Sequence, residues 1–286
     1  MALNAPEWVW PVAATLGEGP VWWSGQLWFT DIKQQKIHRF DPSGETQSWA
    51  APSEVGFLAP RADGHFIAGA KAGLYDFDPA SGVFSLLCTV EPDLPGNRLN
   101  DGAVDARGRL WFGSMDDDER AATGRLYRLE KSALAVMDEG YVITNGPAFS
   151  PDGRTLYHTD TLQKIIYAFD LGEDGALGNR RIFVRIEDGA GYPDGCVVDA
   201  GGSLWTGLFA GWAVRRYSPQ GALLQTIAFP VANVTKIAFG GGDLKTVYAT
   251  TAAKGLSPAD LAAQPLAGAL FSFKTDVPGL PQNLLG

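Results

Sequence analysis

The chain has 286 residues, of which 45% are hydrophobic, and it contains 35 Gly and 18 Pro. The apolar content excludes a disordered chain, and this many turn-forming residues without a collagen period indicates short strands joined by tight turns. The net charge of −9 argues against nucleic acid or an anionic membrane surface as a partner, so we expect a small-molecule ligand. No apolar run approaches the roughly 18 residues of a membrane span, and the first basic residue is Lys33, so the sequence predicts a cytoplasmic protein without a signal peptide.

A short motif of an apolar, an aromatic and a small residue recurs along the chain. Its aromatic positions, 38 to 48 residues apart, are Trp28, Phe66, Trp111, Tyr157, Trp205 and Tyr248. Each copy follows a turn that contains glycine, and most are followed by another strand and turn. This period is that of a four-stranded propeller blade, so we predict an all-β, six-bladed β-propeller.

The two ends of the chain fit this ring. The segment from Trp8 to Ala14 has no blade of its own, so we expect it to pair into the last blade and close a single domain over residues 1–286. Near the other end, Ser257 followed by Pro258 predicts a short inserted helix, with Ser257 as its N-cap.

Polar residues stand at one position of nearly every repeat, about 10 to 12 residues before the aromatic marker. They are Glu18, Asn100 with Asp101, Asn145, Asp194, and Thr235 with Lys236. Inner strands begin beside the propeller axis, so equivalent positions of different blades should meet there. For any single one of these residues, a role in capping a turn remains the alternative.

Three of these residues supply only oxygen donors. Glu18, Asn145 and Asp194 carry two negative charges together, a set that suits a hard divalent cation. Arg98 and Asn100 would add a cationic and a neutral donor from one loop. The run Asp116–Glu119 is typical of a solvated acidic loop, although Glu119 is the member that we expect to reach the mouth.

Other chemistries find little support in the sequence. It contains no GxSxG, GxGxxG or P-loop pattern, which argues against a serine hydrolase and a nucleotide-binding protein. His38, His65 and His158 lack metal-ligand spacing and are expected to be structural. Cys88 and Cys196 form no CxxC pair, so we expect two buried free thiols.

Several ordered motifs resemble those of the senescence-marker-protein, gluconolactonase and regucalcin family. From Leu16 to about Ala253, they are Leu16–Pro20, Asn97–Gly102, Thr144–Gly153, Tyr157–Thr161 and Pro193–Gly195. Other segments are similar to bacterial pentonolactonases, especially xylonolactonase. These segments are Trp28–Gln34, Tyr167–Leu171 and Thr250–Ser257.

The resemblance implies a six-bladed propeller that hydrolyses a sugar lactone with a divalent metal. Carried over by motif, it implies Glu18, Asn145 and Asp194 as metal ligands, and Arg98, Asn100 and Glu119 as sugar contacts. The oxygen donors allow Ca²⁺, Zn²⁺, Mn²⁺, Mg²⁺ or Fe²⁺.

The hypothesis is therefore a hydrolase that opens an aldonolactone, either D-xylonolactone or a related pentono- or hexonolactone. Asp194, or another carboxylate at the mouth, would accept the proton of the attacking water. A non-catalytic calcium- or sugar-binding propeller is the alternative. The sequence leaves the oligomeric state open.

Overall fold

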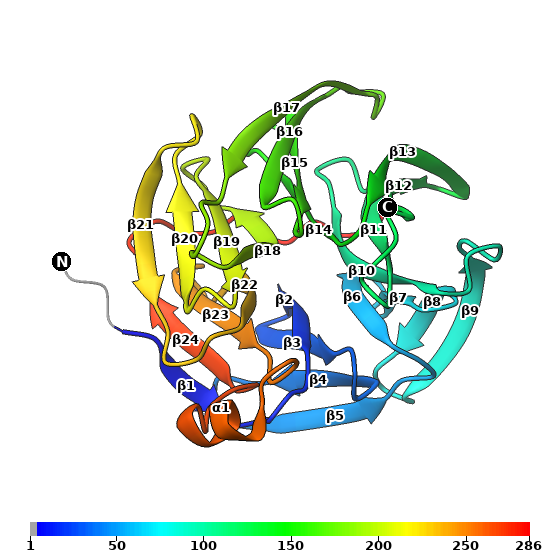
Figure 1. Ribbon diagram of the computed structural model, residues 1–286. Coiled ribbons are helices and arrows are strands. Elements are labelled where there is room, and N and C mark those ends of the chain that lie inside the picture. The colour runs from blue at the N-terminus through cyan, green and yellow to red at the C-terminus, as the bar shows by residue number, and fades with distance from the viewer. Residues whose placement is uncertain (1–4) are drawn as a thin grey trace.

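The computed structural model describes residues 5–286 as six four-stranded antiparallel sheets arranged in a ring (Figure 1). The six-bladed propeller is confirmed. In blades 1 to 5 the strands follow one another in chain order from the axis outward. The innermost strands of neighbouring blades contact one another around the axis.

Blades 1 to 3 use the first half of the chain. Their strands, innermost first, are β2 (Gly17–Trp23), β3 (Gln26–Asp31), β4 (Lys36–Phe40) and β5 (Thr46–Ala50); β6 (Val55–Pro60), β7 (Phe66–Ala70), β8 (Gly73–Asp78) and β9 (Val83–Thr89); β10 (Asn97–Val104), β11 (Leu110–Asp116), β12 (Gly124–Glu130) and β13 (Ala133–Tyr141).

Blades 4 to 6 follow in the same way, and the last blade takes its outermost strand from the N-terminus. Their strands are β14 (Thr144–Phe149), β15 (Thr155–Asp160), β16 (Ile165–Leu171) and β17 (Leu177–Arg185); β18 (Tyr192–Val198), β19 (Leu204–Phe209), β20 (Ala213–Tyr217) and β21 (Leu223–Ala228); β22 (Val234–Gly240), β23 (Thr246–Thr251), β24 (Leu270–Lys274) and β1 (Glu7–Trp10).

The last sheet joins the two ends of the chain. β1 runs antiparallel to β24, with Glu7 opposite Ser272. Beyond β1, the Ala14 amide donates to the Gly268 carbonyl at 2.9 Å. The N-terminal strand thus completes the sixth sheet, and pairing of the two chain ends closes the ring of blades.

The loop between β23 and β24 carries the helix α1 (Pro258–Ala263), which lies outside the ring of sheets (Figure 1). Ser257 caps the helix and forms a capping box with Asp260, as the Ser-Pro pair predicts. Among residues 5–286, no helix is long and apolar enough to cross a membrane.

The core lies between blades rather than within one. The six aromatic markers all stand in the second strand of a blade, and each is at most 4% exposed. Their rings pack against the neighbouring blade, as Trp28 does against Phe66 with ring centroids 4.7 Å apart. Trp205 meets Phe239 of blade 6 at 5.7 Å in the same way. The period of the motif is therefore the period of inter-blade packing.

The C-terminal segment crosses the end of the propeller at which the inner strands finish. The segment is hydrogen-bonded to three blades. The Gly279 amide donates to the Leu244 carbonyl and the Leu285 amide to the Pro60 carbonyl. The Asn283 side chain donates to the Val104 carbonyl. This segment covers an axial cavity of about 150 Å³, lined mainly by apolar side chains.

The two cysteines and three histidines take different positions. Cys196 is buried as predicted, but the expectation for Cys88 is wrong, because β9 is an outer strand and leaves it partly exposed. His65 is also partly exposed and pairs with Asp76 at 2.8 Å. His38 and His158 are buried, and neither His158 ring nitrogen has a hydrogen-bond partner among residues 5–286.

The buried ring of His158 predicts acid sensitivity of the fold. Burial, with a smaller contribution from Arg180, lowers the pKa of His158 from 6.5 to about 3. Protonation therefore favours the unfolded chain, and stability is lost as pH falls from 6.5 towards 3. His158→Phe should remove on the order of 3 kcal/mol of that loss at pH 4, measured as a flatter dependence of melting temperature on pH.

The matched control is His65→Gln. A hydrogen bond with Asp76 raises the pKa of His65, so His65 stabilises the fold at acid pH and its removal should steepen the loss. If His158→Phe left the slope between pH 7 and pH 4 unchanged, His158 would not be the neutral buried group that burial implies.

Candidate functional site

Each innermost strand is irregular close to the level of the polar positions. The pairing register of the strand with its neighbour shifts at Glu18/Val21, Val55/Phe57, Leu99/Gly102, Asn145/Ala148, Pro193/Cys196 and Val234/Ile237. Such a bulge bends the strand and re-aims a side chain that a regular strand would direct to a sheet face. The irregularity recurs in every blade, and in all blades but the second it lies at or next to one of the polar positions.

Most of the polar residues predicted from the sequence line one cavity at the mouth of the propeller, with a volume of about 290 Å³, but Asp101, Thr235 and Lys236 do not. All six predicted site residues are among its lining: Glu18, Arg98, Asn100, Glu119, Asn145 and Asp194. They come from four blades and are brought together only by the ring. Leu16, Met115, Ile143 and Phe209 supply apolar wall between them.

Two buried carboxylates face this cavity. Glu18 is 4% exposed and Asp194 is 6% exposed. Burial, and then the charge of Asp101, raise the pKa of Glu18 to about 7. Burial and the neighbouring Glu18 and Asp101 carboxylates also raise the pKa of Asp194, while the ammonium of Lys254 opposes the rise. Because burial and mutual repulsion disfavour two negative charges here, Glu18 and Asp194 would both ionise readily only with a positive charge beside them.

The amide of Asn145 is oriented by its neighbours. Its Nδ2 donates to Thr161 Oγ1 at 2.9 Å, and its Oδ1 accepts from Asn100 Nδ2 at 3.1 Å. Asn100 Nδ2 also donates to the Thr144 carbonyl at 2.6 Å. An amide oxygen has two lone pairs, so Asn145 Oδ1 can accept from Asn100 and still offer its second lone pair to a ligand in the cavity.

A buried ion pair lies next to the two carboxylates. Lys236 Nζ is 2.5 Å from Asp101 Oδ1, and both side chains are almost wholly buried. Asp101 Oδ2 also accepts from the Gly146 amide at 3.0 Å, which ties blade 3 to blade 4. Lys236 therefore neutralises Asp101, and the pair connects blades 3 and 6 across the axis.

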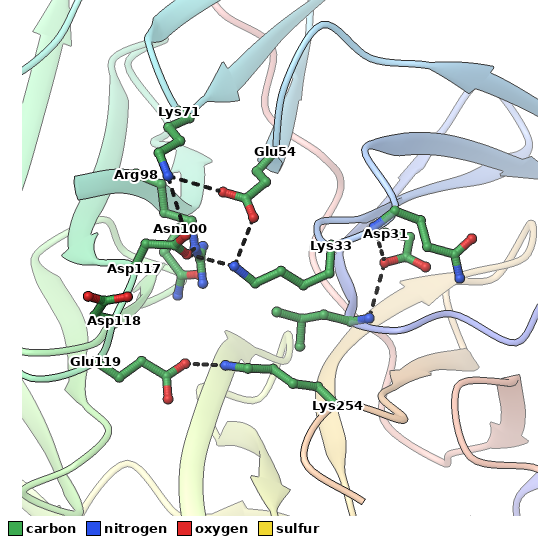
Figure 2. A network of polar contacts seen from close by, with 12 residues as sticks. Asp31, Lys33, Glu54, Lys71, Arg98, Asn100, Asp117, Asp118, Glu119 and Lys254 are labelled. Carbon is green, nitrogen blue, oxygen red and sulfur yellow. Dashed lines mark hydrogen bonds and ion pairs between the residues drawn. The ribbon is translucent and has the colours of Figure 1, made fainter. Parts of the chain in front are cut away.

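Arg98 is only 2% exposed and is held from two sides (Figure 2). Its Nε donates to Asp117 Oδ1 at 2.8 Å, and its Nη1 donates to Asn100 Oδ1 at 2.6 Å. Asp117 also accepts from Lys33 at 2.7 Å and from Lys71 at 3.4 Å, and Lys33 in turn binds Glu54. The guanidinium thus belongs to a network that spans blades 1 to 3.

The acidic run Asp116–Glu119 divides its roles among its members. Asp116 caps its own turn by accepting from the Arg120 and Ala121 amides, and Asp117 binds Arg98. Glu119 lines the cavity, where it pairs with Lys254 from the segment after β23 (Figure 2). The expectation of a solvated loop is therefore wrong for Asp117, which binds cations of other segments, whereas Glu119 lines the cavity at the mouth as expected.

Comparison with known proteins follows the same motifs. The family model described as SMP-30/Gluconolactonase/LRE-like region matches residues 16–253. The chain belongs to this family. It is 36% identical to 6-deoxy-6-sulfogluconolactonase of Pseudomonas putida over 95% of both chains. It is 35% identical to L-arabinolactonase of Azospirillum brasilense over 93% of this chain and 90% of that one.

Solved structures of the SMP-30/gluconolactonase family share the fold. A protein from Agrobacterium tumefaciens, described as a calcium-binding protein, regucalcin, superimposes with a TM-score of 0.95 at 30% identity. The alignment covers 99% of this chain and 98% of that one. The family that the motifs resemble is therefore confirmed over nearly the whole propeller.

The contacts of several residues at the mouth of the propeller could not be predicted from the sequence. Lys254 pairs with Glu119, which is 135 residues away in the chain. Asp117 contacts cations of three blades, so its partners also meet only in the folded ring. Lys236 stands at a register position, but its partner Asp101 could not be chosen from the sequence. Residues 5–286 hold no group of three or more His, Cys, Asp or Glu side chains arranged for a metal ion, so a cation here would need the amide of Asn145.

The close packing under Lys236 gives a stability prediction. A Cβ on Gly195 would lie 2.5 Å from Lys236 Cγ and 2.7 Å from Lys236 Cβ. Gly195→Ala must therefore displace Lys236 from Asp101, and we expect a loss of about 1–3 kcal/mol in the free energy of unfolding by denaturant titration. At Gly178, by contrast, a Cβ meets nothing within 4 Å, so Gly178→Ala should be close to neutral. Equal effects of the two substitutions would contradict the packing argument.

Proposed function

We propose that the protein is a metal-dependent hydrolase that opens an aldonolactone to the aldonic acid. The observation that carries the proposal is the meeting of Glu18, Asn145 and Asp194 with Arg98 and Asn100 in one small cavity. This arrangement provides acidic oxygen atoms for a cation on one side, and the guanidinium of Arg98 and the amide oxygen of Asn100 for a substrate on the other.

The donor set fits a hard divalent cation. Lys236, Arg98 and Lys254 each have a carboxylate partner, whereas no Lys or Arg of residues 5–286 forms an ion pair with Glu18 or Asp194. A divalent cation held by Glu18, Asp194 and Asn145 Oδ1 would balance these two charges. When bound, the cation would polarise the lactone carbonyl and lower the pKa of a water molecule. Ca²⁺, Zn²⁺, Mn²⁺, Mg²⁺ and Fe²⁺ all accept such oxygen donors.

The residues of the chain would orient the lactone and move the proton. Among residues 5–286, the contacts of Arg98 use Nε and Nη1, and Nη2 takes part in none of them. Arg98 Nη2 and Asn100 would hold the lactone oxygens and hydroxyl groups, and Glu119 would accept from a hydroxyl group. Asp194, or another carboxylate at the mouth, would accept the proton of the attacking water. The water oxygen bonds to the carbonyl carbon, the ring C–O bond breaks, and a proton passes to the departing oxygen.

The relatives support a sugar lactone as the substrate class. The names of 6-deoxy-6-sulfogluconolactonase and L-arabinolactonase describe lactones of a hexose and a pentose derivative. A cavity of about 290 Å³ suits a ligand of that size. D-xylonolactone, or a related pentono- or hexonolactone, is the substrate that we propose. A cytoplasmic location stays a prediction.

The alternative is a non-catalytic calcium- or sugar-binding propeller. It is favoured by the Agrobacterium tumefaciens neighbour, which is described as a calcium-binding protein. The same oxygen donors would serve either role, so the difference lies in turnover.

Turnover should depend on a cation bound through Glu18. We expect hydrolysis of pentono- and hexonolactones in a pH-stat, loss of turnover with a chelator, and recovery on adding a divalent metal. Glu18→Gln removes one charge at nearly constant shape and should weaken metal binding and turnover, while the apo protein keeps or gains thermal stability. Metal binding without turnover of any lactone would favour the binding propeller. An active Glu18→Gln variant with unchanged metal affinity would remove Glu18 from the site.

Arg98 should act on the substrate and not on the metal. Because a guanidinium cannot bind a cation, Arg98→Met should leave metal affinity close to that of the wild type. It should lower kcat/KM by about 2–4 kcal/mol of transition-state stabilisation, which is roughly 30- to 900-fold. Lactone kinetics and metal titration on this variant decide the point. Normal kinetics would exclude the substrate role, and lost metal binding would mean that Arg98 supports the metal site.

A further inference from the structure

Asp117 contacts Arg98 without lining the cavity. Its carboxylate accepts from Arg98 Nε at 2.8 Å, while the cavity wall includes Arg98, Asn100 and Glu119 but not Asp117. Asp117 therefore stands on the far side of the guanidinium from the space that a ligand would fill. Its hydrogen bond with Arg98 connects it to a residue of the cavity wall.

The contact with Asp117 completes the immobilisation of a planar group. Arg98 Nη1 is fixed by Asn100 Oδ1 at 2.6 Å and by the Leu99 carbonyl at 3.3 Å. Those two contacts hold one corner of the guanidinium, and the contact of Nε with Asp117 holds its opposite part. A plane fixed at two separate atoms cannot turn about either contact, so the direction of the remaining N–H groups is set in advance.

Asp117 is itself held by more than Arg98 (Figure 2). Its amide donates to the Gly96 carbonyl at 3.0 Å, and its carboxylate binds Lys33 at 2.7 Å. Burial of Asp117 opposes its ionisation, but hydrogen bonds and charges from Lys33 and Arg98 outweigh this effect and hold its pKa well below the usual range. Asp117 is thus a fixed anion, anchored by a cation of blade 1.

We infer that Asp117 is the positioning residue of Arg98, which sets the guanidinium in the orientation that grips the lactone. This inference rests on the proposed function, because it assigns the orientation of a residue to the binding of that substrate. It adds that the acidic loop after β11 serves the site twice, through Asp117 from behind Arg98 and through Glu119 from the cavity wall.

The test compares Asp117→Asn with Asp118→Asn in the metal-loaded protein. Asp117→Asn keeps the shape but removes the charge that binds Arg98 Nε. Asp118 belongs to the same loop and takes part in none of these contacts (Figure 2). We expect Asp117→Asn to lower kcat/KM for the aldonolactone by about 10- to 100-fold with unchanged metal affinity, as a small displacement of a binding group does. Asp118→Asn should behave like the wild type.

A double-mutant cycle separates positioning from a structural role. If Asp117 acts through Arg98, Asp117→Asn should cost little further kcat/KM in an Arg98→Met background. Equal losses in both backgrounds would overturn the inference, and so would a lower melting temperature with unchanged kinetics. Should Asp117→Asn fail to fold, Asp117→Glu keeps the charge but moves it by one methylene, and a loss that vanishes with Arg98→Met is again expected.

Failure of the inference and failure of the proposed function give different results. A wild-type protein that hydrolyses no aldonolactone with any metal overturns both. A wild-type protein that is active, together with an Asp117→Asn variant as active as Asp118→Asn, overturns the role of Asp117 alone.

Discussion

A four-stranded blade cannot bury the aromatic face of its second strand by itself, so each blade must pack against its neighbours. The ring of Trp28 packs against Phe66 of the next blade, and the ring of Trp205 packs against Phe239. Because every blade requires two neighbours, the sheets must form a closed ring, which β1 completes beside β24. Closure then forces six inner strands to converge, so that residues remote in sequence share one small space at the mouth.

Convergence of the inner strands brings several carboxylates close together at the mouth, and Lys and Arg side chains neutralise some of them. Asp101 is neutralised by Lys236, Asp117 by Arg98 and Lys33, and Glu119 by Lys254. Glu18 and Asp194 are buried beside one another, no Lys or Arg between residues 5 and 286 forms an ion pair with either, and burial raises the pKa of both. The divalent cation that we propose at this place would balance the charge of these two carboxylates.

The ion pairs also connect the mouth to the packing of the blades. Lys33, Lys71 and Arg98 belong to blades 1, 2 and 3, and all three contact Asp117. Lys254 and Lys236 belong to the last blade and reach Glu119 and Asp101 of the third. The geometry at a bound lactone would therefore follow the relative positions of the blades.

The period, the blade number and the level of the polar residues could be predicted from the sequence, because inter-blade packing repeats in every blade and places an aromatic residue in each copy. The sequence also determined that Glu18, Asn145 and Asp194 stand in one register, since ring symmetry converts equal register into proximity. The pairing of the charges could be seen only in the folded ring. Asp117 with Arg98 and Glu119 with Lys254 involve loop residues that follow no repeat, and the repeated positions of Asp101 and Lys236 do not indicate that these two residues pair. Their distances depend on bulges and loop paths that a one-dimensional pattern does not encode.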